Sequence, residues 1–576
     1  MLKSQRNRRR HSQRALVGAV LVCAVPLLAL GCMGPIFRPQ SPDAALADAK
    51  QKPDPPAHTQ LVGAVAHPYG INYVKVENVA LVTGLAGTGE DPAPSPQRAA
   101  LLAEMNRRGI EDPNEVLASP NTTLVLVRAF LRPAIQKGDT FDIEVRTPSR
   151  SDTTSLRGGM LLETRLSEAA VLGGQIRYGH ESAIAQGSIL VDPTAAADKN
   201  SMQSTQGRVL SGGVAIKSRK IGLILDHDHQ SIRLSQNVAK AINLRFHTYV
   251  DGRNMGVATP KTDEFIELAM HPRYSENVGR YMRVVRNVAV GESPVQRHER
   301  LALLRDQLMD SVTAETAALR LEAIGDDAVD ILKEGAKSSD AEVRFYAAEA
   351  LAYLDVTEAV APLAKAAVKE RAFRIAALAA LGSMEDGAAA EALYEMLESK
   401  SAETRYGAFR SLSIMESDDP RIAGEKLGNS PYGKFSYHVL HVDGPPLIHA
   451  TSSHRPELVM FGTEHELRLP LVLDAGSRIL VNGLRGGHIT VSRFGPREPT
   501  QERVVSTRVD EVIRAIVDLG GEYPDVVQML RQAENAGALS SRYCEDALPA
   551  PGREFDREPS IDADPVDEAK LLTKAE

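Results

Sequence analysis

The chain has 576 residues, more than one hydrophobic core usually holds, so we expect several domains. Its hydrophobic fraction of 43%, charged fraction of 25% and net charge of -8 are those of a globular protein without the basic excess that binding to nucleic acid needs. The absence of Trp also argues against aromatic platforms that stack on sugars or single-stranded bases.

The N-terminus has the pattern of an export signal. A basic run, Lys3 to Arg14, precedes an apolar run, Ala15 to Leu30, that would reach about 24 Å as a helix, less than a bilayer core. We therefore predict a signal peptide over residues 1–31. The sequence Ala29-Leu-Gly-Cys32 resembles a bacterial lipobox, which predicts acylation of Cys32 and a membrane anchor. The alternative is a signal that is removed without lipidation.

The chain has three cysteines, and their positions limit disulfide formation. Cys23 lies in the predicted signal and Cys32 is the predicted anchor, which leaves Cys544 alone. The mature chain then forms no intramolecular disulfide, so packing and assembly must stabilise it. We expect Cys544 to be a structural thiol, with pairing between subunits as the alternative.

Residues 32–60 are rich in Pro, Ala and Asp and are predicted to be a tether. Residues 61–295 are mostly β in pattern. Thr123 to Leu131 is an apolar run interrupted only by Arg128, whereas Phe141 to Val145 alternates strictly. Helical spacing interrupts these strands near Pro96–Arg108 and Ser231–Asn243. This region is therefore predicted to be a β-rich core.

Residues 297–425 change to a helical period and repeat. Arg344, Arg374 and Arg405 stand 30 and 31 residues apart, and each is followed by Ala and Leu at matching positions. This spacing resembles HEAT-type repeats, in which each helix pair buries its apolar face against its neighbours. The three arginines either tie one repeat to the next, which we expect, or bind a partner on a concave face.

The remaining chain divides into three predicted segments. Residues 429–500 read as a small β-rich segment, with strands separated by Gly and Asp. Residues 501–547 read as a helix pair, the first helix ending at Gly520-Gly521 and the second beginning at Pro524. Residues 548–576 form an acidic tail that we expect to be disordered.

Three glycine-containing signatures distinguish the β-rich core. They are Thr83 to Glu90, Asp152 to Thr164, and Ala183 to Gly187. Read in order, they are similar to the flagellar P-ring protein family, and the likeness extends over residues 73–290 and again over residues 509–539. The residues that carry it are Gly84, Gly87 and Gly89, then Ser155, Leu156, Arg157, Gly158 and Gly159, then Gln186 and Gly187.

The resemblance implies a multidomain α+β protein in which a HEAT-like helical insert, followed by the small β-rich segment, separates the P-ring-like core from the C-terminal helix pair. It also implies a structural role without catalysis, cofactor or metal. Copies of the chain would polymerise in the periplasm into a ring around the flagellar rod, in contact with rod and L-ring proteins. This ring would support rotation of the rod in motility. The helical repeats and the lipobox depart from the family pattern. We therefore expect the repeats to supply either an added outer collar or a docking surface for another envelope protein, and Cys32 to carry an acyl anchor in the membrane.

The polar signature has two possible roles. Thr154 and Ser155 can hydrogen-bond nearby backbone, Arg157 offers a planar fork for carboxylates or carbonyls, and Gly158-Gly159 permit positive φ or close approach of another backbone. These features fit a contact between subunits. They fit equally an internal turn whose arginine pairs within its own domain.

Other patterns suggest chemistry only weakly. Gly84 to Gly89 lacks the Lys-Ser/Thr that follows in a phosphate loop. Asp226-His-Asp-His229 has no third ligand in a recognisable frame, so we expect a solvated turn. The irregular spacing of four histidines near Asp443 and Ser452 specifies neither a triad nor a zinc site; they are His438, His441, His449 and His454.

Two other functions therefore remain as alternatives to a ring subunit. One is an envelope lipoprotein scaffold whose P-ring-like core and repeats bind a protein partner unrelated to motility. The other is a metal-assisted hydrolase that uses the histidine-rich β segment.

Overall fold

The computed structural model describes residues 59–172, 175–191, 205–250, 253–415, 418–429, 434–484, 486–495 and 499–555. The predicted signal peptide, Cys32 and nearly all of the predicted tether lie outside the described residues. All described residues belong to one compact unit.

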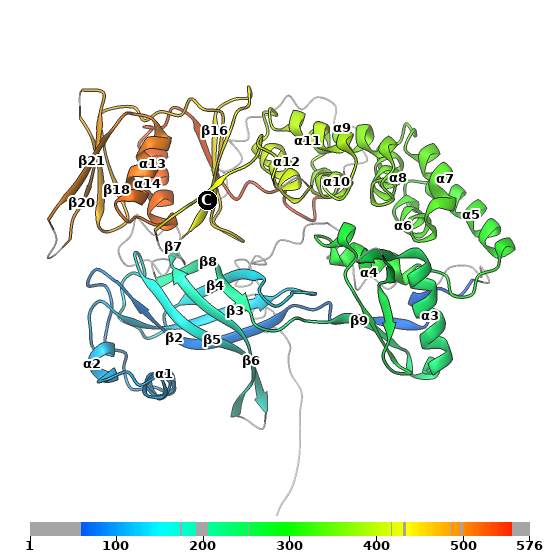
Figure 1. Ribbon diagram of the computed structural model, residues 1–576, viewed down its shortest axis with the longest axis horizontal. Helices are drawn as coiled ribbons and strands as arrows, with labels where there is room; N and C mark the ends of the chain where they lie inside the picture. The colour runs from blue at the N-terminus through cyan, green and yellow to red at the C-terminus, as the bar shows by residue number, and fades with distance from the viewer. Residues whose placement is uncertain are drawn as a thin grey trace, which may run out of the picture. The chain divides into compact units, whose positions relative to one another are not determined.

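The P-ring-like core begins with a sheet that closes on itself (Figure 1). Its strand order is β4-β3-β2-β5-β6-β8, every pairing is antiparallel, and β8 returns to pair with β4. The strands are β2 (Val74–Thr83), β3 (Thr123–Leu131), β4 (Thr140–Arg146), β5 (Met160–Leu172), β6 (Gln175–Ser188) and β8 (Gln206–Ala215), and the short β7 (Leu190–Val191) also pairs with β8.

Two helices lie in the connection between β2 and β3. They are α1 (Pro96–Arg107) and α2 (Pro113–Leu117). The Ser95 hydroxyl accepts a hydrogen bond from the Arg98 amide at 3.1 Å, so it caps the first helix. Leu101 and Leu117 pack with Leu81 and Leu124 of the sheet, which covers part of its surface.

A second sheet completes the core region. Its strand order is β1-β9-β13-β12, with bounds Ala66–Tyr69, Ile221–Leu225, Phe265–Leu268 and Ala258–Pro260. Helix α3 (Ile232–Arg245) confirms one predicted helix, whereas α4 (Val278–Arg286) was not predicted. The remaining elements are β10 (His247–Val250), β11 (Arg253–Gly256) and short 3-10 turns at Val62–Ala64, His227–His229 and Pro272–Tyr274.

The helical region contains four successive helix pairs (Figure 1). The Ser293 hydroxyl begins the first helix in a capping box, and Asp340 and Asp386 cap later helices with their carboxylates. The pairs are α5 (Pro294–Leu308) with α6 (Ala314–Ile324), α7 (Val329–Gly335) with α8 (Ala341–Tyr353), α9 (Val360–Lys369) with α10 (Arg374–Leu381), and α11 (Gly387–Met396) with α12 (Ala402–Met415).

The C-terminal elements form two sheets and a helix pair. The first sheet has the order β14-β15-β17-β16-β22, with bounds Glu425–Leu427, Phe435–Leu440, Glu457–Phe461, Leu447–Ala450 and Arg542–Glu545. The second has the order β18-β19-β20-β21, with bounds Leu471–Ala475, Ile479–Gly483, Ile489–Arg493 and Gln501–Val505. Helices α13 (Val509–Asp518) and α14 (Tyr523–Asn535) lie beside the second sheet (Figure 1).

The C-terminal fold differs from the sequence expectation in two ways. Strand β22 follows the helix pair but pairs with β16, so the two segments predicted separately share one sheet and one hydrophobic cluster. Residues 548–555, assigned above to the disordered tail, lie against the helical repeats, where Arg553 binds Glu403 and Phe555 stacks on Phe373. The rest of the predicted tail, residues 556–576, lies outside the described residues.

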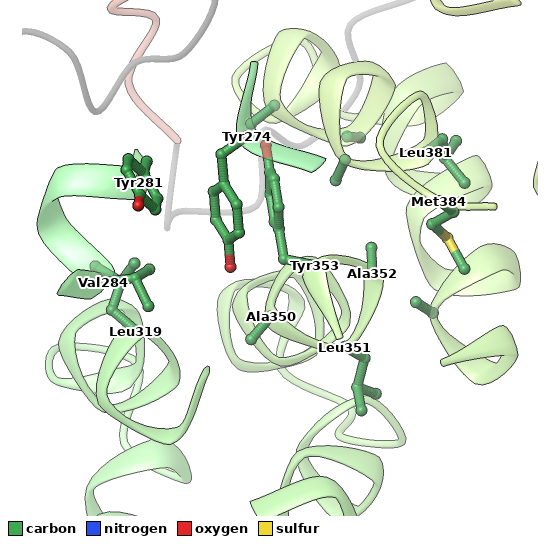
Figure 2. Packing of buried hydrophobic residues seen from close by; sticks show 14 of the residues in the cluster. Tyr274, Tyr281, Val284, Leu319, Ala350, Leu351, Ala352, Tyr353, Leu381 and Met384 are labelled. Carbon is green, nitrogen blue, oxygen red and sulfur yellow. The ribbon is translucent and has the colours of Figure 1, made fainter. Parts of the chain in front are cut away.

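A buried charge joins the core to the helical repeats. Arg280 of α4 is 1% exposed and lies 2.6 Å from a Glu322 carboxylate oxygen of α6 and 2.7 Å from a Glu349 oxygen of α8. The Tyr274 hydroxyl donates to Glu322 at 2.6 Å. Its ring stacks on that of Tyr353 with centroids 4.8 Å apart, and Figure 2 shows the two rings side by side. The repeats are therefore bonded to the core by a network without access to water.

The predicted multidomain α+β class is confirmed, with a β-rich core, a helical repeat region, further small sheets and a helix pair. Within the described ranges, no helix combines the length and apolar character that crossing a bilayer requires.

We expect Arg280→Met to destabilise the folded chain by roughly 3–5 kcal/mol, because it leaves two buried carboxylates without their cation. Arg305→Ala is the control, since Arg305 pairs with Glu334 in solvent and its loss should not shift the unfolding midpoint measurably. Denaturant unfolding followed by circular dichroism measures both. Equal midpoints for the two variants would contradict the buried network.

Candidate assembly site

The first signature follows the end of β2 and runs beside residues 119–122. The amide of Gly89 donates to the Pro120 carbonyl at 2.9 Å, and that of Leu85 donates to the Asn121 carbonyl at 3.1 Å. A Cβ on Gly89 would lie 2.1 Å from the Thr122 carbonyl oxygen, which only glycine avoids. Gly84 and Gly87 have positive φ, at 80° and 78°.

The second signature packs directly against the first. The Thr88 hydroxyl donates to the Ser155 carbonyl at 2.8 Å, and the Thr154 amide donates to the Thr88 carbonyl at 3.0 Å. Leu156 is fully buried, and the Ser155 hydroxyl accepts the Arg157 amide at 3.2 Å. The predicted polar turn is therefore a turn held by its own backbone and by the first signature.

Strand register brings the third signature to the same end of the sheet. Leu161 of β5 stands opposite Val82 of β2 on one side and Gly187 of β6 on the other. The Ile189 amide donates to the Gly159 carbonyl at 3.0 Å. The three signatures, far apart in sequence, thus form one junction, while the Gln186 side chain is half-buried there.

Gly159 allows this junction to close tightly. A Cβ at this position would lie 2.6 Å from a methyl carbon of Val82 and 2.9 Å from the Leu156 carbonyl oxygen. Gly158 has φ +72° and faces Ser477 of the β18–β19 turn, whose hydroxyl would lie 3.3 Å from an added Cβ. Gly158 therefore lies against the chain's own C-terminal region.

Further bonds connect this end of the sheet to the C-terminal helix pair. The Ser188 hydroxyl donates to the Glu522 carboxylate, which also caps α14. A guanidinium nitrogen of Arg531 donates to the Val191 carbonyl at 3.3 Å. Much of the signature region is thus accounted for by contacts within one chain.

The guanidinium of Arg157 differs from its neighbours. It is half-buried, yet within the described ranges it makes neither a hydrogen bond nor an ion pair. Burial lowers the pKa of Arg157, the nearby charge of Arg531 lowers it further, and Asp474 acts in the opposite direction. The pairing within its own domain, which was one of the two expected roles, is not present among these residues.

The three arginines of the repeats bind backbone carbonyls that precede their own helices. For Arg374 and Arg405 these carbonyls lie at the end of the preceding helix, and for Arg344 they lie in the connection between α7 and α8. Arg374 is buried and donates to the Ala367 carbonyl at 2.9 Å and to Glu403 at 2.9 Å. Arg405 donates to the Leu397 carbonyl at 2.7 Å, and Arg344 donates to the Ser338 carbonyl at 2.7 Å. Cations near helix C-termini are favourable, so the contacts of Arg374 and Arg405 favour the structural role.

The histidines are dispersed among separate contacts. His438 bonds the Ile422 carbonyl at 2.9 Å, and buried His449 stacks on Tyr406 with centroids 3.6 Å apart. His67 bonds Asp226 at 3.0 Å at the exposed turn of the Asp226 motif. The part of the chain that the structure describes contains no group of three or more His, Cys, Asp or Glu placed to hold a metal ion.

Sequence reasoning missed a second junction, centred on Asp142 of β4. The alternating pattern predicts an outward side chain, yet Asp142 is 1% exposed. One oxygen accepts the Ser211 amide at 3.0 Å and the other accepts the His454 amide. Ser211 and His454 both have positive φ, and the Ser211 hydroxyl donates to the His454 carbonyl at 2.9 Å. A buried acid between two such turns has no local sequence signal.

The comparisons with known proteins agree with the predicted resemblance. Residues 63–299 match the family model described as flagellar P-ring protein, and residues 373–399 match the one described as PBS lyase HEAT-like repeat. Both sheets of the core lie within the first match. The resemblance to the P-ring family is therefore confirmed for this region, whereas the likeness proposed for residues 509–539 lies outside the match and stays a prediction.

Individual relatives give the same result. The chain is 28% identical over 192 residues to a flagellar P-ring protein of Caulobacter vibrioides, covering 32% of this chain and 50% of that protein. It is 30% identical over 223 residues to one of Thermotoga maritima, covering 37% and 61%, and 29% identical over 253 residues to flagellar P-ring protein 1 of Chromobacterium violaceum, covering 41% and 63%. The chain thus spans less than two thirds of the length of these relatives.

Gly89→Ala should destabilise the fold by about 3 kcal/mol, because its methyl group would overlap a backbone carbonyl that cannot move aside. Gly87→Ala is the matched control: nothing lies within 4 Å of its added Cβ, so only the positive φ opposes it, at about 1–2 kcal/mol. Thermal and denaturant unfolding rank the two variants. A larger loss for the Gly87 variant would disprove the packing described for the first signature.

Burial raises the pKa of Asp142 to about 6 from an ordinary value of 3.8, although the two amides and Arg208 act against it. The folded chain therefore binds this proton more tightly than the unfolded chain, and ionised Asp142 costs stability that returns as the pH falls. Relative to the wild type, Asp142→Asn should be more stable at about pH 7 than at about pH 4, by roughly 2–3 kcal/mol. If the stability difference between the variant and the wild type did not change with pH, the buried environment of Asp142 would be refuted.

Proposed function

We propose that the chain is a structural subunit that assembles with copies of itself into a ring of the P-ring type in the periplasm, around the flagellar rod. The observation that carries this proposal is the family match over residues 63–299, which contains the closed sheet and all three glycine signatures. Relatives named flagellar P-ring protein support the same role. Rod and L-ring proteins are then the expected neighbours, and motility the process served.

The work of such a subunit is mechanical. Copies would meet head to tail through different surfaces, and a ring results when the rotation between neighbours closes. Rigid subunits suit this role, and the buried network at Arg280 and the junction of the three signatures each bond segments that lie far apart in the chain. We assign no catalysis, cofactor or metal to it.

Arg157 is the residue that we propose contacts a neighbouring subunit. Its guanidinium is half-buried at the junction of the signatures and has no hydrogen-bonding partner among the described residues. The planar guanidinium of Arg157 can therefore donate hydrogen bonds to carboxylate or carbonyl oxygens supplied by another copy. Gly158 beside it faces Ser477 of the same chain, whose hydroxyl would lie 3.3 Å from an added Cβ.

We further propose that Cys32 carries the acyl anchor and that residues 1–31 are removed on export. Anchoring would hold the subunit at a membrane surface while its neighbours assemble. The test is metabolic labelling with a palmitate analogue, in which Cys32→Ala should abolish incorporation.

A second candidate function is an envelope scaffold whose repeats recruit a protein unrelated to motility. The observation that favours it is the helical region itself, which lies largely beyond the P-ring match. Deletion of the gene separates the two functions: loss of swimming and of basal-body rings supports the ring subunit, while normal flagella and normal swimming refute it.

We expect Arg157→Ala to weaken self-association of the purified mature protein by roughly tenfold, or about 1.4 kcal/mol, with an unchanged unfolding midpoint. Arg165→Ala is the matched control, since exposed Arg165 of β5 already pairs with Glu181. Sedimentation velocity across a concentration series measures both variants. Assembly of the Arg157 variant at wild-type strength would exclude this residue from the subunit contact.

A further inference from the structure

The segment after β22 leaves the C-terminal sheet and lies on the helical repeats. The chain turns at Asp546, where φ is +47°, and the Ala547 amide donates to a ring nitrogen of His449 at 2.9 Å. Residues 549–555 then continue without helix or strand. A Cβ on Gly407, inside α12, would lie 3.6 Å from Pro549, so the segment runs close to this helix.

The first anchor of this segment is a bidentate ion pair. The two terminal nitrogens of Arg553 donate to the two carboxylate oxygens of Glu403, at 2.8 and 2.6 Å. Glu403 also accepts from Arg374 at 2.9 Å. Burial alone would raise the pKa of Glu403, but the bonds and charges of the two arginines outweigh it and hold this pKa below its ordinary value. Glu403 thus remains ionised and oriented toward a guanidinium.

The second anchor is aromatic. The ring of Phe555 stacks on Phe373 at the start of α10, with centroids 4.8 Å apart and planes at 16°. Phe373 in turn stacks on Phe345 of α8, at 4.1 Å and 6°. With the segment in place, Phe373 and Phe345 are 5% and 3% exposed, so Phe555 completes a buried aromatic stack. Offset or parallel ring pairs at such distances are favourable.

Three properties of this arrangement point to a docking site for extended peptide. The two anchor residues are two positions apart in the bound segment, a spacing that suits an extended chain. The repeat residues Phe345, Phe373 and Glu403 come from three successive helix pairs. The platform carries one carboxylate and two rings, which complement one arginine and one aromatic residue. The bound segment adds no strand pairing to its surroundings within the described residues, so side-chain contacts hold residues 553–555 on the repeats.

We propose that the surface formed by Phe345, Phe373 and Glu403 is a docking site for an extended segment of a partner protein that carries an arginine and, two residues later, an aromatic residue. The chain's own Arg553-Glu554-Phe555 occupies the site in the absence of that partner and is displaced by it. The covalent connection holds this occupant at a high effective concentration, so only a partner with further contacts, or one concentrated locally, displaces it. The inference is independent of ring formation, because it concerns the repeats of a single chain.

The test measures binding in trans to the full-length protein. The probe is a fluorescent peptide with the sequence of residues 547–555, and the variant is the full chain with Arg553→Ala and Phe555→Ala, which vacates the site. Fluorescence anisotropy should give an affinity for the variant roughly tenfold or more above that for the wild type, whose own segment competes. Adding Glu403→Gln to the variant should remove most of that binding, because no carboxylate then pairs with the peptide arginine.

A second peptide with Ala in place of its arginine is the specificity control, and it should bind the variant roughly tenfold more weakly. Hydrogen exchange of residues 373–405 checks that the variant stays folded. A folded variant that does not bind the probe overturns the proposal. Equal binding of both peptides, or equal binding by the wild type and the variant, overturns it as well. Each measurement uses dilute, unassembled protein, so failure of the ring proposal would leave its result unchanged.

Discussion

The fold depends on one charge that is kept out of water. Arg280 lies in α4 of the P-ring-like core, but both of its carboxylate partners belong to the repeats. Moving an unpaired guanidinium or carboxylate into a protein interior costs several kcal/mol, so each partner requires the others to stay in place. The core's last helix and the first two repeat pairs therefore form one cooperative body. The helical region is an integral part of the molecule rather than an appendage on a linker.

The hydrophobic packing is also continuous between the core, the helical repeats and the first C-terminal sheet. A single hydrophobic cluster runs from Val62 and Phe246 in the core, through the helix pairs, to Phe461 in the first C-terminal sheet. The end of the closed sheet meets the other C-terminal elements through Ser188 and Asp142. The helical region therefore contacts the rest of the chain at both of its ends. This explains how a long helical region can separate the core from the C-terminal helices without loosening either.

Local patterns predicted the elements that depend on neighbours in sequence. Strand β3 begins and ends where its apolar run does, α1 starts at the predicted proline, and the repeating arginines mark successive helix pairs correctly. The signatures were recognised, but their convergence follows from strand register that no single segment encodes. Asp142 and Arg280 look like surface residues in their own segments, because the groups that bury them lie far away in the chain. The contacts of residues 548–555 were missed for the same reason, because the ring on which Phe555 stacks, that of Phe373, lies far away in the chain.

The closure of the sheet between β4 and β8 has a consequence for how copies can meet. An open six-stranded sheet would present two rows of unsatisfied amides and carbonyls, which invite indiscriminate strand addition. Here those rows satisfy each other. Association at β4 and β8 must then use side chains and turns, whose shapes and charges distinguish the correct neighbour from any other extended polypeptide.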